Sequence, residues 1–388
     1  MRVPVPRRRA IALAAAALVA LAGCTGHDGS GYVGPAPSAA SPWKIARMVG
    51  PPGGSTEMQD ISATGPRDAW AIAQACFACG PGSARLVVEH WDGASWRPLP
   101  AMPRPALTAQ NAFVGASSAS DAWVLAEFDR GADALHWDGR RWAVFRALGC
   151  GQVFPAVFGP DDAWAFSGGT RACAARFDGH AWRTVPMPGV PAAVSPVSRD
   201  DIWAIGSARA SGPASASAAT TQFVAVAMHW NGRSWHVIAY PDLPAAASHT
   251  LTGGTIVATG PRDVWVENGI QAEGSNTSTE LVLHWDGRNW HRVFVPLAPH
   301  GVWSMARDGR GGLWLTAEGS GPAGINWYFY HLHGGRVTPV AAPARRGSDQ
   351  LYDAGRLAWI PGTTSLWGIE TLSSRANGSQ GAIFRFSG

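Results

Sequence analysis

The chain of 388 residues carries a recurring phrase whose first clear copy reads His90-Trp91-Asp92-Gly93-Ala94-Ser95-Trp96. The phrase returns from His136, His229 and His284, and a variant copy reads Arg176-Phe177-Asp178-Gly179-His180-Ala181-Trp182. Asp-Gly between alternating apolar runs is a strong hairpin signal, because a type I′ turn needs positive φ at both central residues. Asn231-Gly232 in one copy suits the same turn. Each phrase therefore predicts a strand, a two-residue turn and a second strand.

A second phrase alternates with the first and consists of a turn followed by Asp, a small or apolar residue, and Trp. Its tryptophans, with two decayed copies at the end, are Trp70, Trp123, Trp164, Trp203, Trp265, Trp314 and Trp367. The steps between them run from 39 to 62 residues. Two hairpins per repeat make a four-stranded sheet, and sheets repeated at this period are typical of β-propeller blades. The sequence thus predicts an all-β propeller of about seven blades.

The two ends of the chain predict how the propeller closes. The final residues 383–388 match the third strand of a repeat, and no fourth strand follows. Residues 42–48 match a fourth strand that lacks the other three. We therefore expect the N-terminal strand to complete the last blade, which removes an exposed sheet edge.

The repeated phrases resemble those of a broad group of secreted actinobacterial proteins with Asp-x-Trp-Ala and His-Trp-Asp-Gly-x-x-Trp repeats. The resemblance covers residues 43–388 and implies the propeller fold. The group has no single activity that could be transferred to this chain.

The N-terminal residues predict export and lipidation. Arg7, Arg8 and Arg9 precede an apolar run over residues 10–22, which has the proportions of a signal peptide. The run ends in Leu21-Ala22-Gly23-Cys24, which resembles the lipobox of bacterial lipoproteins. The resemblance implies a signal peptide over 1–23, lipidation of Cys24, and anchoring to the cell membrane on its extracytoplasmic side. The alternative is an ordinary cleaved leader.

Residues 24–42 join the lipidated cysteine to the propeller and are mostly Gly, Ser, Pro and Ala, which predicts a flexible tether. Without the four arginines of the leader, Lys and Arg fall from 31 to 27 and match the 27 Asp and Glu. A neutral mature chain argues against nucleic acid as a partner. We expect a monomer.

Four cysteines follow Cys24, and an exported chain favours disulfides. Three pairings are possible, and blade positions favour Cys150 with Cys173 and Cys76 with Cys79. A redox or metal site at Cys76-x-x-Cys79 is the alternative.

The chemistry-bearing residues predict no catalytic site, cofactor or metal. The repeat histidines belong to different blades and cannot converge on one ion, and His331-x-His333 lacks a visible third ligand. Most tryptophans recur at equivalent positions, which indicates packing between blades. The inferred innermost strands near residues 153–158, 192–197 and 255–259 hold no ionisable group.

Binding therefore fits the sequence better than catalysis, and we expect the face with variable loops to hold a protein, peptide or glycan. The candidate ligand contacts are Trp327, Tyr328 and Tyr330, whose alternative role is strand packing. The alternative function is a propeller enzyme acting on cell-envelope or extracellular glycans.

Overall fold

The structure is a computed structural model of the chain. It describes residues 42–79, 83–104, 106–109, 111–128, 131–145, 148, 153–168, 172–209, 223–239, 250–271, 278–295, 301–321, 324–342, 350–374 and 378–387. All of them belong to one compact unit, Gly34–Gly388. The predicted signal peptide, Cys24, most of the tether and Cys150 lie outside these ranges. In the described part, no helix is long and apolar enough to cross a membrane.

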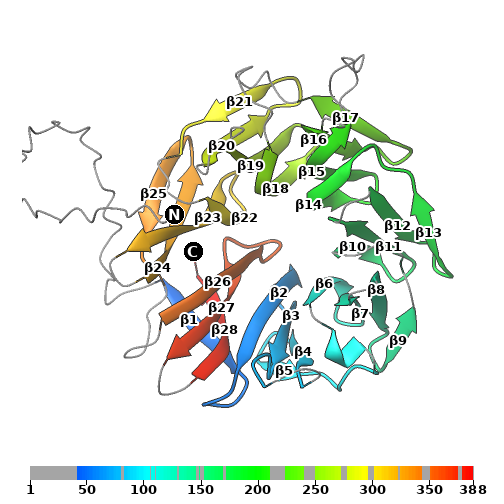
Figure 1. The fold of residues 1–388 in the computed structure, drawn as a ribbon, viewed down its shortest axis with the longest axis vertical. Coiled ribbons are helices and arrows are strands. Elements are labelled where there is room, and N and C mark those ends of the chain that lie inside the picture. Colours follow the sequence, from blue (N-terminus) through cyan, green and yellow to red (C-terminus); the bar gives the residue numbers. More distant parts are fainter. Residues whose placement is uncertain are drawn as a thin grey trace, which may run out of the picture. The chain divides into compact units, whose positions relative to one another are not determined.

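The described strands form seven antiparallel sheets of four strands each, which are the blades of a β-propeller (Figure 1). We number the blades one to seven in chain order of their innermost strands. The innermost strands are β2 Thr56–Gly65, β6 Asn111–Ser118, β10 Val153–Gly159, β14 Val190–Ser198, β18 Thr250–Gly260, β22 Val302–Arg307 and β26 Gln350–Trp359. The second strands are β3 Asp68–Ala75, β7 Asp121–Phe128, β11 Asp162–Ser167, β15 Asp201–Arg209, β19 Asp263–Gln271, β23 Leu313–Gly321 and β27 Leu366–Ser374.

The two outer strands form a hairpin in blades one to six, and in blade seven they are the last and the first strands of the chain. The third strands are β4 Arg85–Trp91, β8 Gly131–Trp137, β12 Cys173–Phe177, β16 Phe223–Trp230, β20 Ser278–Trp285, β24 Gly324–His333 and β28 Gly378–Phe386. The outer strands are β5 Trp96–Pro98, β9 Trp142–Phe145, β13 Trp182–Val185, β17 Trp235–Ala239, β21 Trp290–Val293, β25 Arg336–Val340 and β1 Trp43–Val49. A short 3-10 helix, η1 Ala106–Thr108, precedes blade two.

The predicted closure is confirmed. Strand β1 pairs antiparallel with β28, with Trp43 opposite Phe386 and Val49 opposite Gly381. The ring of Trp43 is 4% exposed and lies 5.1 Å from Phe386 and 5.2 Å from Phe329 between ring centroids. Because Phe329 belongs to blade six, this one side chain joins the closing strand to the neighbouring blade.

The outer hairpins differ from the prediction in their turns. Trp91 pairs directly with Trp96, so the turn holds four residues rather than two. Gly93 has a φ of 93°, whereas Asp92 is not in the positive-φ region. The Asp92 carboxylate instead accepts hydrogen bonds from the backbone N–H groups of Ala94 and Ser95, at 2.9 and 2.8 Å. The turn therefore needs the side-chain oxygen of this aspartate as a hydrogen-bond acceptor. In blade four, Asn231 Oδ1 accepts in the same way from Arg233 N–H.

Tryptophans pack between blades, as predicted. Trp70, Trp123, Trp164 and Trp203 on the second strands are at most 1% exposed. The ring centroid of Trp123 lies 5.2 Å from that of Trp182 in the next blade, and Trp164 lies 5.1 Å from Trp230 in the same way. Each such ring buries on the order of 150–250 Å², so these contacts add a large apolar area to the seam between neighbouring blades.

Each repeat histidine pairs with an aspartate of its own blade. His136 Nε2 lies 2.7 Å from Asp121 Oδ1, and its ring stacks on Trp123 at 4.5 Å. Equivalent His–Asp pairs recur in blades one, four and five, and in blade three Arg176 makes the pair with Asp162. These residues link the second strand to the third within a blade.

Candidate functional site

A cavity of about 750 Å³ lies where the seven innermost strands converge. Every innermost strand contributes lining residues, most of them from its first half. Because these strands begin on the face that carries the connections between blades and the connections between second and third strands, the cavity belongs to that face. This is the face on which the sequence places the variable loops.

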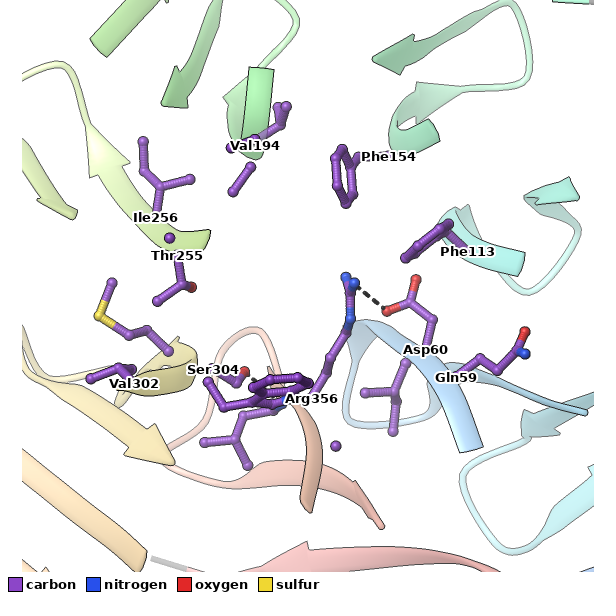
Figure 2. A pocket seen from close by; sticks show the side chains of 18 of the residues that line it. Gln59, Asp60, Phe113, Phe154, Val194, Thr255, Ile256, Val302, Ser304 and Arg356 are labelled. Atoms are coloured by element: carbon purple, nitrogen blue, oxygen red, sulfur yellow. Dashed lines mark hydrogen bonds and ion pairs between the residues drawn. The ribbon is translucent and has the colours of Figure 1, made fainter. Parts of the chain in front are cut away.

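An ion pair in the cavity wall joins the last blade to the first. Arg356 on β26 reaches Asp60 on β2, with Nη1 3.5 Å from Oδ1 (Figure 2). The second carboxylate oxygen of Asp60 accepts a hydrogen bond of 2.8 Å from the backbone N–H of Val114 in blade two. The side chain of Asp60 is 8% exposed, whereas that of Arg356 is 41% exposed. The guanidinium therefore faces the cavity and the carboxylate supports it from the wall.

Burial raises the pKa of Asp60 above its ordinary value. Three contacts act in the opposite direction, namely the charge of Arg356 and the backbone N–H groups of Val114 and Ile61. Desolvation outweighs them because a carboxylate loses most of its hydration at this depth.

Aromatic rings line the cavity beside this ion pair. The guanidinium carbon of Arg356 lies 4.8 Å from the ring centroid of Phe113, and Phe113 lies 5.4 Å from Phe154 (Figure 2). Trp303 on β22 also lines the cavity and is 53% exposed, which is high for a tryptophan in this chain. An exposed indole in a concave site offers a face for stacking or for a cation.

Carboxylates outnumber cations around the cavity. The ionisable lining residues are Glu57, Asp60, Glu267, Glu318 and Arg356. Four of these groups are carboxylates and one is a guanidinium, counted over the described lining residues. The innermost strands of blades three to five hold no ionisable group, as expected from the sequence. Those of blades one, six and seven do carry such groups, among them Asp60, Arg307 and Arg356.

Side chains of one innermost strand bond to the backbone of the next and hold the wall in place. Gln59 Oε1 accepts from Ala112 N–H at 2.9 Å, and Ser304 Oγ accepts from Leu357 N–H at 3.1 Å. Ser195 Oγ accepts from Ala258 N–H at 2.9 Å in the same manner. These bonds fix neighbouring blades against each other at the cavity, so the site is formed before any ligand enters.

The structure places the three predicted ligand contacts on β24, behind the residues that line this cavity. Trp327 is 6% exposed, and its ring meets Trp303 edge-on at 5.7 Å. Tyr330 is 1% exposed and belongs to an apolar cluster against which Tyr328 packs. They border the cavity lining through Trp303, through Glu318, which pairs with Trp327 across β23 and β24, and through Val302 and Met305 of the same apolar cluster. A direct contact between these three residues and a ligand stays a prediction.

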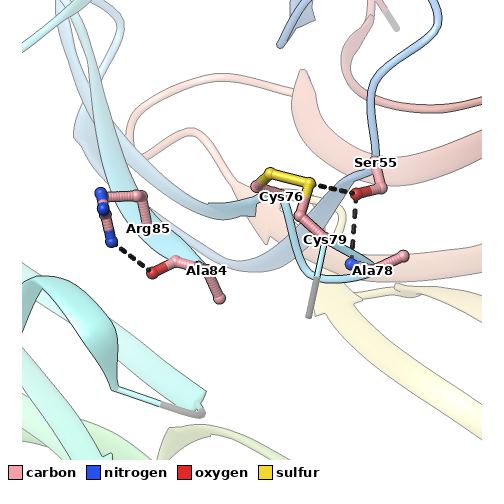
Figure 3. The surroundings of a disulfide bond; sticks show 6 residues. All are labelled: Ser55, Cys76, Ala78, Cys79, Ala84 and Arg85. Atoms are coloured by element: carbon pink, nitrogen blue, oxygen red, sulfur yellow. Dashed lines mark hydrogen bonds between the residues drawn. A yellow bond between two sulfur atoms is a disulfide. The ribbon is translucent and has the colours of Figure 1, made fainter. Parts of the chain in front are cut away.

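The predicted disulfide between Cys76 and Cys79 is present, with Cα atoms 5.1 Å apart (Figure 3). It closes a short loop after β3, on the same face as the cavity. Ser55 Oγ accepts a hydrogen bond of 3.1 Å from Ala78 N–H and so ties this loop to the start of blade one. Cys173 is also disulfide-bonded. Cys150 lies outside the described residues, so its pairing with Cys173 stays a prediction.

Comparisons with known proteins support the propeller fold and assign the chain to no family. No family model matches the chain, and no curated protein matches it in sequence. Among solved structures, it is similar to YCF48 bound to D1 peptide, with a TM-score of 0.57 and 14% identity over 91% of this chain and 97% of that one. An ulvan lyase of polysaccharide lyase family PL25 gives a TM-score of 0.53 and 11% identity over 88% and 97%. The RRP9 WD40 repeats give 0.52 and 12% over 90% and 98%.

Proposed function

We propose that this protein is a lipid-anchored binding propeller that takes up a peptide or protein segment with a basic side chain in its central cavity. The observation that carries the proposal is the exposed ring of Trp303 in a cavity whose described lining residues include four carboxylates and one guanidinium. A tryptophan face and a focused negative potential both favour a Lys or Arg side chain. The cavity volume is in the range of small-ligand sites.

The pre-formed wall supports binding rather than movement around a substrate. Side chains on β2, β14 and β22 hold the backbone of the adjacent blade through hydrogen bonds. A rigid site lowers the entropy that binding must offset. YCF48, which shares the fold, has been solved bound to D1 peptide, so a propeller of this architecture has room for a peptide ligand.

The anchoring half of the proposal rests on Leu21-Ala22-Gly23-Cys24 and the apolar run before it. Lipidation of Cys24 would hold the propeller at the outer side of the cell membrane. The tether of residues 24–42 would leave the propeller free to meet partners in the envelope.

A glycan-active enzyme is the second candidate, and Asp60 is the observation in its favour. A buried carboxyl group with a raised pKa suits a general acid. Its oxygens, however, already face Val114 N–H and Arg356, and only 5% of the residue is exposed. The lining also offers one guanidinium against four carboxylates, a composition that suits an anionic polysaccharide poorly. Peptide binding is therefore the better supported function.

A peptide array tests the proposal. Immobilised peptides would differ only in one central residue, which is Arg, Gln or Glu, and neutral and anionic oligosaccharides would be screened beside them. We expect the Arg series to bind most strongly and the Glu series most weakly, with binding that weakens as salt rises. A preference for anionic glycans, or their cleavage, would favour the enzyme instead.

A further inference from the structure

Blade six departs from the repeat at the position where the other blades carry their structural aspartate. The residue two positions before Trp314 is Gly312, whereas Asp68 and Asp121 occupy this place in blades one and two. The carboxylate comes instead from Asp308, in the turn between β22 and β23. His331 Nε2 lies 2.9 Å from Asp308 Oδ2, and the His331 ring stacks on Trp314 at 4.4 Å. The usual histidine thus keeps its partner through a different residue.

A second histidine meets the same oxygen. His333 Nδ1 lies 3.0 Å from Asp308 Oδ2. The ligating atoms of Asp308, His331 and His333 all lie within 4.8 Å of one another. In the part of the chain that the structure describes, no other group of three His, Cys, Asp or Glu side chains converges in this way.

The carboxylate is fixed from behind. Asp308 Oδ1 accepts hydrogen bonds from the backbone N–H groups of Arg310 at 2.6 Å and Gly312 at 2.7 Å. Its side chain is 3% exposed, while those of His331 and His333 are 30% and 49% exposed. Oδ2 is therefore directed at the two rings, and the rings border the solvent.

Gly312 provides the space for this arrangement. A Cβ at this position would lie 2.5 Å from Asp308 Oδ2 and 2.8 Å from His333 Nδ1. The aspartate that other blades carry here would thus occupy the place where the three ligating atoms meet. The loss of the repeat residue and the gain of the second histidine belong to one local rearrangement.

We propose that Asp308, His331 and His333 form a binding site for a divalent first-row transition metal such as Zn²⁺. Two imidazoles and one carboxylate are a ligand set that suits these ions and leaves further positions for water. Ligand atoms around a tetrahedral Zn²⁺ lie about 3.3 Å apart, given bonds of about 2.0–2.1 Å. The present nitrogen–oxygen distances of 2.9 and 3.0 Å need to open by only a few tenths of an ångström.

Metal binding requires a lone pair on each ligating nitrogen. His331 would bind through Nε2 with its proton on Nδ1, and His333 through Nδ1 with its proton on Nε2. Two neutral rings need only this change of tautomer, so no proton is lost. The site lies on the face of the turns after β22 and β24, opposite the face of the central cavity. It is therefore independent of the proposed peptide binding.

Zinc titration of the chain without a polyhistidine tag, after treatment with a chelator, tests this site. We expect one equivalent of Zn²⁺ to bind by calorimetry, and Co²⁺ to give the absorption bands of a low-coordinate site with nitrogen and oxygen ligands. His333→Gln should weaken Zn²⁺ binding at least about tenfold. The matched control is His291→Gln, because His291 pairs with Asp286 at 2.7 Å without a third ligand in the described residues.

Thermal unfolding in the chelator shows whether His333→Gln is folded, which its 49% exposed side chain leads us to expect. Added Zn²⁺ should then raise the melting temperature of the natural chain and of His291→Gln but not of His333→Gln. Equal zinc affinities for the two variants, or no zinc binding to the natural chain, would overturn the proposal.

Discussion

Arg356 of the last blade and Asp60 of the first blade form an ion pair in the wall of the central cavity, with Nη1 and Oδ1 3.5 Å apart. The pair exists because ring closure brings β26 next to β2. It combines a buried carboxyl group with a guanidinium that is 41% exposed. The buried carboxyl group should affect the stability of the fold, and the exposed guanidinium can contact a ligand.

Asp60→Asn tests the buried charge through pH. The folded-state pKa of Asp60 is raised, so the folded protein holds this proton more tightly than the unfolded chain does. Ionisation therefore costs stability as the pH rises from the unfolded value of about 3.9 through the folded one. We expect the free energy of unfolding of Asp60→Asn, relative to the natural chain, to increase between pH 4 and pH 7 in urea titrations.

Arg356→Met is the companion variant for this experiment. It removes the positive charge that favours the carboxylate, so the destabilisation of the natural chain with rising pH should become larger. A difference between Asp60→Asn and the natural chain that stays constant with pH would show that Asp60 does not titrate in this way.

The His–Asp pair of a blade should contribute more to stability than a surface pair of the same chemistry. His136→Ala leaves Asp121, which is 3% exposed, without its nitrogen donor and removes a ring stacked on Trp123. We expect a loss of about 2–3 kcal/mol in the free energy of unfolding. His291→Ala, whose partner Asp286 is solvent-exposed, should have a much smaller effect. Equal losses would mean that burial does not set the strength of the pair.

Trp43 should be the main contribution of β1 to ring closure. Trp43→Ala removes a ring that is 4% exposed and contacts Phe329 and Phe386, which should cost about 3–5 kcal/mol. Met48→Ala on the same strand is the control, because Met48 is 36% exposed. Deletion of residues 42–49 should expose the edge of β28 and cause aggregation in light scattering. A soluble, cooperatively unfolding deletion variant would contradict this role of β1.

Much of the fold could be predicted because its signals are local and repeated. A Trp follows each inner turn, and the outer turn carries Asp-Gly in blades one, two, three and five and Asn-Gly in blade four. The four-residue turn was missed because Asp-Gly also suits a two-residue turn. The strand register, in which Trp91 pairs directly with Trp96, could be seen only in the structure.

The cavity could not be predicted in the same way. Asp60, Arg356 and Trp303 belong to no repeated phrase, and only ring closure brings residues so distant in sequence together. Asp308 was missed for a similar reason, since it lies outside the position that the repeat assigns to the aspartate. Searching every innermost strand for ionisable residues would have found Asp60 and Arg356.

Lipidation of Cys24 predicts that the chain is held at membranes and that loss of this cysteine releases it. In a bacterial host that processes lipoproteins, the natural chain should incorporate an alkyne-labelled fatty acid and sediment with membranes. Cys24→Ala should lose the label and the membrane association while the propeller remains folded. Equal labelling of both chains would rule out Cys24 as the modified residue.

The central claim is that the cavity binds a ligand through Trp303, and calorimetric titration with the strongest peptide of the Arg series tests it most directly. Trp303→Ala should lower the affinity at least about tenfold. Phe294→Ala should leave it unchanged, because Phe294 is 88% exposed and does not line the cavity. Thermal unfolding of both variants would verify that they are folded. An affinity that is unaffected by Trp303→Ala would contradict the account and move the binding site away from the central cavity.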